Sequence, residues 1–309
     1  MVASHLTQQD LGEWAKSDRQ ANSIFQGPHL FGKFLECIAY GQQDKAERLL
    51  GEVFKGQPEK IQAALQYQGK FTDYSGRTFI NCTAYEYAYW AKDTYMCRML
   101  ERHMDGATKA YMFARINEIE RIDADTGQRV GLVYHQGGLE HRSAHFDLTP
   151  LISALQRYVD GYDNWARTRN WGAIDAAWME VGLEQRDIPV HVVNEYCHPD
   201  RSFNPIPEFN EEILPRKTRF YNWSTGSMET ALFPLVISDV SGLGVDFSLA
   251  GGGERAVGRA AHGCRRAYTA PRLDLAAVSH LDEVRDEDLM LSREILQSAV
   301  SELGHSRRF

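Results

Sequence analysis

The chain has 309 residues, of which 43% are hydrophobic and 25% charged, and its formal net charge is −8. This length allows one large domain or two smaller ones, each with a core of its own. The negative charge argues against nucleic acid and anionic membranes as partners, because both favour a basic protein face.

Residues 1–26 are polar and weakly patterned, so we expect a loosely held lead-in. They lack the basic and apolar regions of a Sec signal peptide. The next segment, 27–105, has mostly helical periodicity, and Thr83 with Glu86 has the spacing of a capping box at a helix start. Residues 69–79 are rich in turn formers and predict a link between helices. The segment is expected to be a stack of helix pairs.

Residues 106–250 are expected to form a mixed helix and strand catalytic domain. The Gly-Gly pair at 137–138 lies between two short runs, which predicts a strand, a turn and a second strand. Thr149 and Pro150 then supply an N-cap and a first-turn proline for a helix. Short alternating runs further along this domain predict additional strands.

The last part of the chain divides at a change of composition. Residues 251–272 contain three consecutive glycines and five arginines, which predicts a flexible linker. Residues 273–309 are expected to be a polar helical tail. The predicted fold class is α+β, with an N-terminal stack of helix pairs followed by a mixed helix and strand domain. No apolar run reaches the roughly 18 residues that a membrane helix needs, so a soluble protein is expected.

His191 and Glu195 form the first candidate site. On a helix, residues four apart lie on one face, about 5–6 Å between their Cβ atoms. A carboxylate at that distance can orient an imidazole and raise its basicity, as a general acid or base requires. The alternative is a structural histidine whose hydrogen bond goes to a helical neighbour. Arg201, just past the helix, is a candidate for gripping a phosphate.

The segment Glu140–Asp147 is the second candidate. His141, Ser143 and His145 alternate along an expected strand, so their side chains would point to one side. Such a polar face needs hydrogen-bond partners if it is buried. The alternative is an exposed strand face.

A metal reading combines the two candidates. His141, His145, His191 and Glu195 are a plausible zinc set by ligand type. Neither segment matches a familiar metalloenzyme motif, and the preferred interpretation has no protein-bound metal site.

A further segment, from Met228 to Pro234, resembles the late glutamate region of mono-ADP-ribosyltransferases, in which Glu229 would fix the nicotinamide ribose. No R-S-E set accompanies it, and the alternative is an ordinary strand end. The five cysteines contain no C-x-x-C pair and are interpreted as thiols in a reducing compartment.

Ser143 together with His191-x-x-x-Glu195 resembles the S-HxxxE family of bacterial effectors and toxins, typified by LnaB-type AMP transferases. The motif portion covers roughly residues 131–203. A second likeness, from Thr72 to Asp93, is to an ankyrin-like helical module of Legionella-type effectors.

The resemblance implies an enzyme that uses ATP and Mg²⁺ to transfer AMP onto a phosphate-bearing host target. It also implies actin as an activator, a modified ubiquitin or phosphoprotein as the acceptor, and delivery into the host cytosol by a specialised secretion system. His191 would be the acid/base or the group that meets the reacting phosphate, and Glu195 would orient it or bind a magnesium ion. Ser143 would hydrogen-bond the nucleotide phosphates or support the histidine. Arg142, Arg201 and His145 are candidates for phosphate or nucleotide contact. The alternative functions are a helical host-protein-binding module without catalysis and an ADP-ribosyltransferase that uses Glu229.

Overall fold

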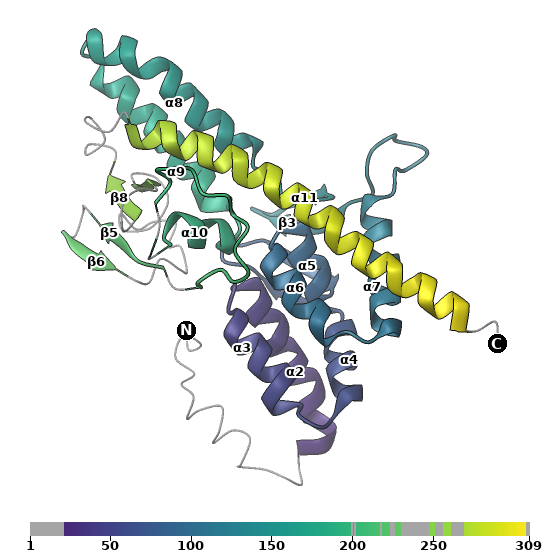
Figure 1. The fold of residues 1–309 in the computed structure, drawn as a ribbon. Coiled ribbons are helices and arrows are strands. Elements are labelled where there is room, and N and C mark those ends of the chain that lie inside the picture. Colours follow the sequence, from purple (N-terminus) through teal and green to yellow (C-terminus); the bar gives the residue numbers. More distant parts are fainter. Residues whose placement is uncertain are drawn as a thin grey trace.

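The computed structural model describes residues 22–198, 200, 202–216, 218–222, 226–229, 247–250, 256–260 and 269–306. Arg201, the predicted lead-in up to residue 21 and the triple glycine at 251–253 lie outside these residues. Within the described chain the fold is α+β, as the sequence predicts (Figure 1).

The first half of the chain is a stack of short helices. The capping box of Thr83 and Glu86 is confirmed: the Thr83 hydroxyl accepts the Glu86 N–H, and the Glu86 carboxylate accepts the Thr83 N–H. This arrangement satisfies two backbone donors that a helix start otherwise leaves free. The helices are α2 (Asn22–Ala39), α3 (Gln43–Arg48), the π-helix η1 (Leu49–Val53), α4 (Pro58–Gln66), α5 (Ala84–Trp90), α6 (Thr94–His103) and α7 (Gly106–Glu120).

An antiparallel sheet packs against these helices. Its strands follow chain order and are β1 (Gly69–Thr72), β2 (Thr78–Cys82), β3 (Leu132–Gln136) and β4 (Leu139–Ser143). The predicted hairpin around the Gly-Gly pair is therefore confirmed. The expected link at 69–79 is instead the hairpin of β1 and β2, whose alternating burial gives it a core face in Phe71 and Phe79.

The second half contains three helices and a second sheet. The helices are α8 (Thr149–Arg167), α9 (Trp171–Asp187) and α10 (Val190–Tyr196). Thr149 is the first residue of α8 rather than its N-cap, which is Leu148. The second sheet has the order β6-β5-β8-β7, from β5 (Phe220–Asn222), β6 (Ser227–Glu229), β7 (Phe247–Ala250) and β8 (Ala256–Ala260).

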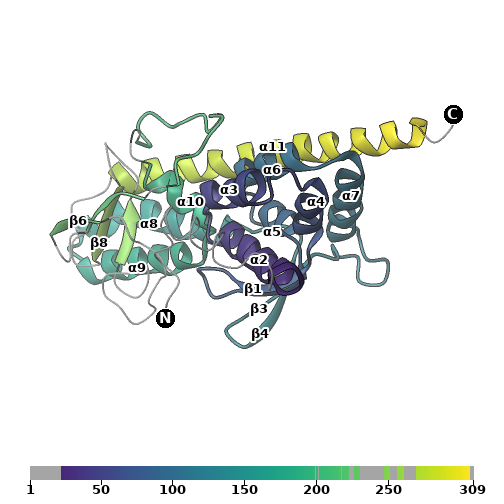
Figure 2. The same cartoon turned by 90° about the horizontal axis from the view of Figure 1, so that it is seen from below.

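The last helix, α11 (Thr269–Ser306), is long and continuous. It runs across the molecule beside α8 at one end and α7 at the other, and it also packs on α6 (Figures 1 and 2). One hydrophobic core spans residues 34–144 and includes Leu289 and Leu296 of α11. The other spans residues 148–281 and includes Leu281 of the same helix. The segment predicted to be a tail thus contributes to both cores.

Along the chain, one core gives way to the other near residue 146. The sequence predicts a domain boundary between residues 105 and 106 instead. Helix α7 belongs to the first core through Met112 and Ile116. Part of the expected linker, 251–272, is ordered as β8 and as the start of α11. Glycine and arginine content does not report strand pairing, because pairing depends on a partner strand elsewhere in the chain.

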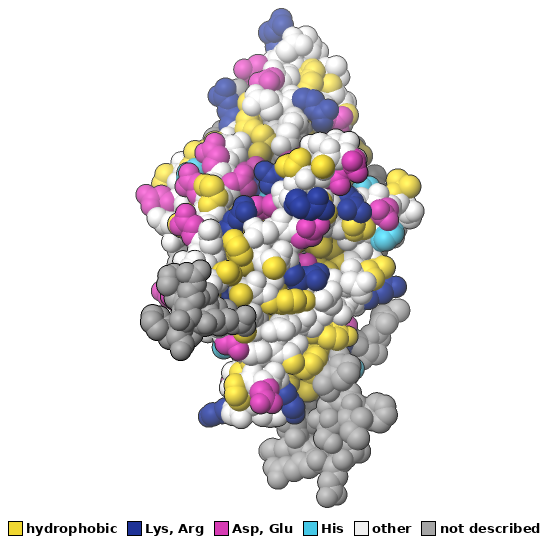
Figure 3. Space-filling model, turned by 90° about the vertical axis from the view of Figure 1, so that its right-hand side faces the viewer, with side chains coloured by type: hydrophobic (Ala, Val, Ile, Leu, Met, Phe, Trp, Pro, Cys, Tyr) yellow, Lys and Arg dark blue, Asp and Glu magenta, His cyan; other side chains and the backbone are white. Residues whose placement is uncertain are grey.

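No helix in the described part of the chain is long and apolar enough to cross a membrane. On the face shown in Figure 3, acidic and basic side chains are interspersed, with hydrophobic side chains between them. The described residues on that face form no broad basic patch of the kind that binds nucleic acid.

Candidate functional site

The turn between β1 and β2 is built around a buried ion pair. The Asp73 carboxylate accepts the backbone N–H groups of Ser75 and Arg77, each at 3.0 Å, and forms a 2.8 Å ion pair with Arg77 Nε. Both side chains of the pair are 2% exposed. The Tyr87 hydroxyl donates to the same carboxylate at 3.3 Å. The turn is therefore held by several charge-assisted bonds.

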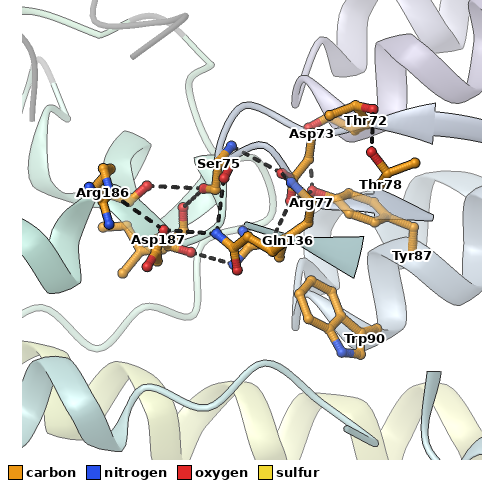
Figure 4. Close-up of polar contacts among 12 residues, drawn as sticks. Thr72, Asp73, Ser75, Arg77, Thr78, Tyr87, Trp90, Gln136, Arg186 and Asp187 are labelled. Carbon is orange, nitrogen blue, oxygen red and sulfur yellow. Dashed lines mark hydrogen bonds and ion pairs between the residues drawn. The ribbon is translucent and has the colours of Figure 1, made fainter. Parts of the chain in front are cut away.

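This turn also forms hydrogen bonds with the C-terminal end of α9. Arg77 Nη1 donates to the carbonyl of Asp187 at 2.6 Å, and the Ser75 hydroxyl donates to the carbonyl of Arg186 at 3.1 Å. From β3, Gln136 Nε2 donates to the Ser75 carbonyl and to the Asp187 carboxylate, both at 3.0 Å. Figure 4 shows these side chains converging from the hairpin, from β3 and from α9. These hydrogen bonds hold in place the short connection between the end of α9 and the start of α10.

A cavity of about 220 Å³ lies where these elements meet. Ser143, at the end of β4, lines it, and the Ser143 hydroxyl oxygen accepts the indole N–H of Trp90 at 2.9 Å. The lining residues come from both halves of the chain: Arg77, Trp90, Tyr134, Gln136, Ser143, Phe146, Asp147, Pro150, Leu151, Glu184, Asp187 and Ile188.

The turn from α5 to α6 connects this cavity to a buried ionic cluster. Trp90 ends α5, and its carbonyl accepts the N–H of Phe146 at 2.6 Å. Lys92, two residues later, bonds Asp282 and Asp286 of α11 at 2.6 and 2.7 Å. Asp93 forms a two-bond pair with Arg216, at 2.8 and 2.9 Å. The turn from α5 to α6 thus contributes Trp90 to the cavity wall at one end. At its other end, Lys92 and Asp93 pair with three residues of opposite charge.

His191 lies in this cluster and is only 1% exposed. Burial lowers the pKa of His191 to about 3; Asp93 opposes this shift, while Arg285 and Arg216 reinforce it. The imidazole is therefore neutral at physiological pH. Its Nδ1 atom is buried and has no hydrogen-bond partner among the described residues.

Glu195, one helical turn further along α10, is bound by Arg285 of α11. Glu195 Oε1 lies 3.0 Å from Arg285 Nη2, and the exposures are 0% and 1%. Arg285 Nη1 also donates to the carbonyl of Phe209 and pairs with Asp288. The same guanidinium lies over the ring of Tyr95, 4.5 Å from its centroid. Arg285 thus holds the Glu195 carboxylate in place, and its charge also acts on the His191 imidazole.

The three residues of the sequence motif occupy two neighbouring environments. Ser143 lines the cavity, whereas His191 and Glu195 are not among its lining residues and belong to the ionic cluster. The connection between them is the segment from Trp90 to Asp93, which bonds Ser143 at its first residue and lies beside His191 at its last. Their predicted convergence in one reactive site stays a prediction.

The other predicted contact residues point to structural partners. Arg142 is exposed, and its Nη1 donates to the carbonyl of Val130 at 3.0 Å. His145 Nε2 lies 3.4 Å from Glu120. The hydrogen bond from His145 is the largest cause that lowers the pKa of Glu120 to about 2; Tyr89 and Arg293 also bond this carboxylate.

The zinc set of His141, His145, His191 and Glu195 is not assembled. His141 stacks on Tyr134 with ring centroids 5.3 Å apart, His145 lies beside Glu120, and Glu195 pairs with Arg285. His191 lies apart from His141 and His145, in the buried cluster with Asp93. Among the residues that the structure describes, no group of three or more histidine, cysteine or acidic side chains is placed to hold a metal ion. A Mg²⁺ ion commonly needs only one or two carboxylates plus nucleotide phosphates, and the cavity wall has carboxylates of that kind.

Sequence reasoning missed Arg77, Asp93 and Arg285 as members of the site. The spacing of Asp73 and Arg77 within a turn was a weak signal for the first of these, because an aspartate at a turn start commonly accepts backbone N–H groups. Nothing local marks Arg285, whose partner Glu195 is 90 positions away.

Comparisons with known proteins identify a relative over nearly the whole chain. The chain is 35% identical to the uncharacterised protein CBUA0006 of Coxiella burnetii (strain RSA 493 / Nine Mile phase I) over 312 aligned positions, which cover 96% of this chain and 86% of that protein. Residues 150–296 match the model of the CBUA0006 C-terminal domain. No solved structure matches the chain.

Proposed function

Since the chain belongs to the CBUA0006 family, we propose a function from its own geometry and from the S-HxxxE resemblance: it transfers AMP from ATP to a phosphate-bearing protein of a host cell. The observation that supports this most is the position of Ser143 on the wall of a cavity beside a buried arginine and aromatic rings. Hydroxyl and guanidinium donors suit phosphate oxygens, and aromatic rings suit a nucleotide base.

In the proposed reaction an oxygen of the acceptor phosphate forms a bond to the α-phosphorus of ATP. The bond from that phosphorus to the bridging oxygen breaks, and pyrophosphate leaves. Such a transfer depends on positioning and on neutralising charge more than on a covalent nucleophile. Mg²⁺, when bound, would neutralise charge on the phosphates.

We assign Ser143 direct contact with the phosphates and give His191 and Glu195 a positioning role. A buried imidazole with a pKa of about 3 is a weak proton acceptor at physiological pH. Glu195 ties α10 to α11 through its ion pair with Arg285. His191 lies near Asp93, at the end of the segment that starts at the cavity wall with Trp90.

The test uses the full chain, ATP, Mg²⁺, actin and a host-cell extract, with the label on either the α- or the γ-phosphate of ATP. We expect protein-bound label from the α-phosphate only. Ser143→Ala should reduce it by at least roughly tenfold, since one lost phosphate donor typically costs 10²–10³ in rate. Ser298→Ala is the matched control, because that hydroxyl is exposed and bonds only its own helix, at Glu294. Equal transfer by wild type and Ser143→Ala would sink the proposal.

A second candidate is the binding of a host protein without catalysis. Exposed apolar side chains on α11 favour it: Met290 is 61%, Leu291 57% and Ile295 45% exposed. Apolar side chains grouped on one surface mark interaction sites. This function would be favoured if a preparation that transfers no label retains a host protein. The retention should be lost when these three residues are replaced by serine. The ADP-ribosyltransferase alternative has no such observation, since only the backbone of Glu229, in β6, is described.

A further inference from the structure

Arg77 is the most buried charged group on the cavity wall, and its hydrogen bonding is incomplete. The Nε atom pairs with Asp73 and Nη1 donates to the carbonyl of Asp187. The third nitrogen, Nη2, is buried and has no hydrogen-bond partner among the described residues. Leaving a charged donor unpaired at 2% exposure costs free energy, so such a group is expected to have a partner in the functional state.

The aromatic rings beside Arg77 offset this cost only in part. Its guanidinium carbon lies 5.2 Å from the ring centroid of Trp90 and 5.1 Å from that of Phe146. Cation–π contacts of this kind stabilise a guanidinium by about 0.5–2 kcal/mol but do not replace a hydrogen bond to an oxygen. All three side chains line the cavity, so a ligand there can supply the oxygen.

Ser143 offers a second donor on the same wall. Its oxygen accepts the Trp90 indole N–H, and its own hydroxyl proton is donated to no described residue. Arg77, Trp90 and Ser143 all belong to the N-terminal half of the chain. That wall therefore presents donors suited to an oxyanion.

Residues that follow Ser143 in the chain contribute carboxylates to the same cavity. Asp147 accepts the N–H of Thr149 through Oδ1, and Asp187 accepts the Gln136 amide. Burial, and then the charge of Asp187, raises the pKa of Glu184. A positive group next to Glu184 would oppose this pKa shift, because it favours the charged carboxylate.

We propose that this cavity binds a small zwitterion, with its oxyanion against Arg77 and Ser143 and its cationic nitrogen against the carboxylates of Asp147 and Glu184. A simple anion would meet three carboxylates, and a simple cation would leave Arg77 Nη2 unpaired. The cavity volume, about 220 Å³, is below the roughly 300–1,000 Å³ of drug-sized sites, so it matches a small molecule or one end of a larger ligand. The site shares Ser143 with the proposed AMP transfer but needs no nucleotide.

The first experiment follows the indole N–H signal of Trp90 by NMR in the ¹⁵N-labelled full chain, assigned by its loss in Trp90→Phe. The probes are phosphoethanolamine, inorganic phosphate, ethanolamine, and inorganic phosphate with Mg²⁺, at equal ionic strength. We expect phosphoethanolamine to shift the signal with a Kd at least tenfold lower than that of either half-molecule. No shift, equal affinity for the half-molecules, or a response to phosphate only with Mg²⁺ would overturn the proposal.

The second experiment measures the affinity of variants by calorimetry. Glu184→Gln should weaken phosphoethanolamine about tenfold without weakening phosphate, and Ser143→Ala should weaken both. Glu180→Gln is the matched control on α9, because Glu180 is exposed and pairs with Arg157 at the surface. Arg77→Lys should abolish binding, but the buried pair with Asp73 makes unfolding an expected complication. The Glu184 and Ser143 variants therefore decide the outcome if Arg77→Lys does not fold; unchanged affinity in both contradicts the inference.

The experiments can contradict the AMP-transfer proposal and the zwitterion proposal independently of each other. Phosphoethanolamine binding in a chain that transfers no α-phosphate label leaves the zwitterion site standing and removes AMP transfer. Label transfer without any effect of phosphoethanolamine on Trp90 removes the zwitterion site instead.

Discussion

Glu195 and Arg285 form an ion pair at 3.0 Å in which neither side chain is more than 1% exposed. The pair joins α10 to α11, two elements that the sequence gives no reason to connect. A buried pair is costly to desolvate and more costly to break, because the remaining charge is then left without a partner. It follows that Glu195 has a structural role in joining α10 to α11.

Removing one partner of this pair should therefore lower the stability of the folded protein. We expect Arg285→Met to lower the free energy of unfolding by about 3–5 kcal/mol. Arg157→Met, which removes an exposed pair with Glu180, is expected to change it by about 0–1 kcal/mol. Urea denaturation monitored by circular dichroism measures both. Similar losses in the two variants would show that burial does not govern these pairs.

Stability should depend on pH through His191. Its pKa is lowered from 6.5 in the unfolded chain to about 3 in the folded chain, so the unfolded state binds the proton first. The stability that comes from keeping the imidazole neutral is complete above pH 6.5 and declines as the pH falls toward 3. The loss between pH 7.5 and 5 is about 2 kcal/mol. His191→Gln should flatten this decline, and an unchanged slope in the variant would contradict the assignment. His135→Gln, at an exposed histidine, is the control.

A second pH effect is expected at lower pH from Glu120. Hydrogen bonds, first from His145, lower its pKa from 4.5 to about 2. The stabilisation is thus present above pH 4.5 and is lost as the pH falls through 2. Melting temperatures at pH 5 and pH 3 should differ less in Glu120→Gln than in wild type. An equal difference would mean that other carboxylates dominate acid unfolding.

Gly41 should be sensitive to substitution because of its contact with the start of α10. Its φ is +61°, and an added Cβ would lie 2.4 Å from Val190 Cγ1. Gly41→Ala is expected to destabilise the fold by about 1–3 kcal/mol, from steric overlap and backbone strain. Val190→Ala should restore part of this loss in the double variant, because only the overlap is relieved.

Gly51→Ala is the matched control, since an added Cβ there meets nothing within 4 Å and its φ is not positive. It should leave stability unchanged or raise it, as alanine is the better helix former. Thermal unfolding of the four chains measures these effects. A double variant no more stable than Gly41→Ala would exclude overlap with Val190 as the cause.

Local signals were enough to predict several elements. The capping box at Thr83 and Glu86 and the Gly-Gly hairpin between β3 and β4 are confirmed, because each is determined by residues a few positions apart. The hairpin of β1 and β2 was missed because its turn residues look like a link, and its strands are recognisable only once Phe79 meets Tyr134 of β3.

The candidate site was harder to predict for the same reason. Ser143 and His191 were singled out by motif, but their surroundings depend on distant parts of the chain. Lys92 and Asp282 are 190 positions apart, and Asp93 and Arg216 are 123 apart. Periodicity and spacing report on neighbours along a helix or strand. They carry no information on which charges meet after folding.

The continuous helix α11 contributes Leu281 to one core and Leu289 and Leu296 to the other. Undocking it would expose both at once, so its amide hydrogens can exchange only when the two halves loosen together. The helix therefore couples the halves into one cooperative unit. Hydrogen exchange in the middle of α11 should report the opening of the whole molecule rather than the fraying of a peripheral segment.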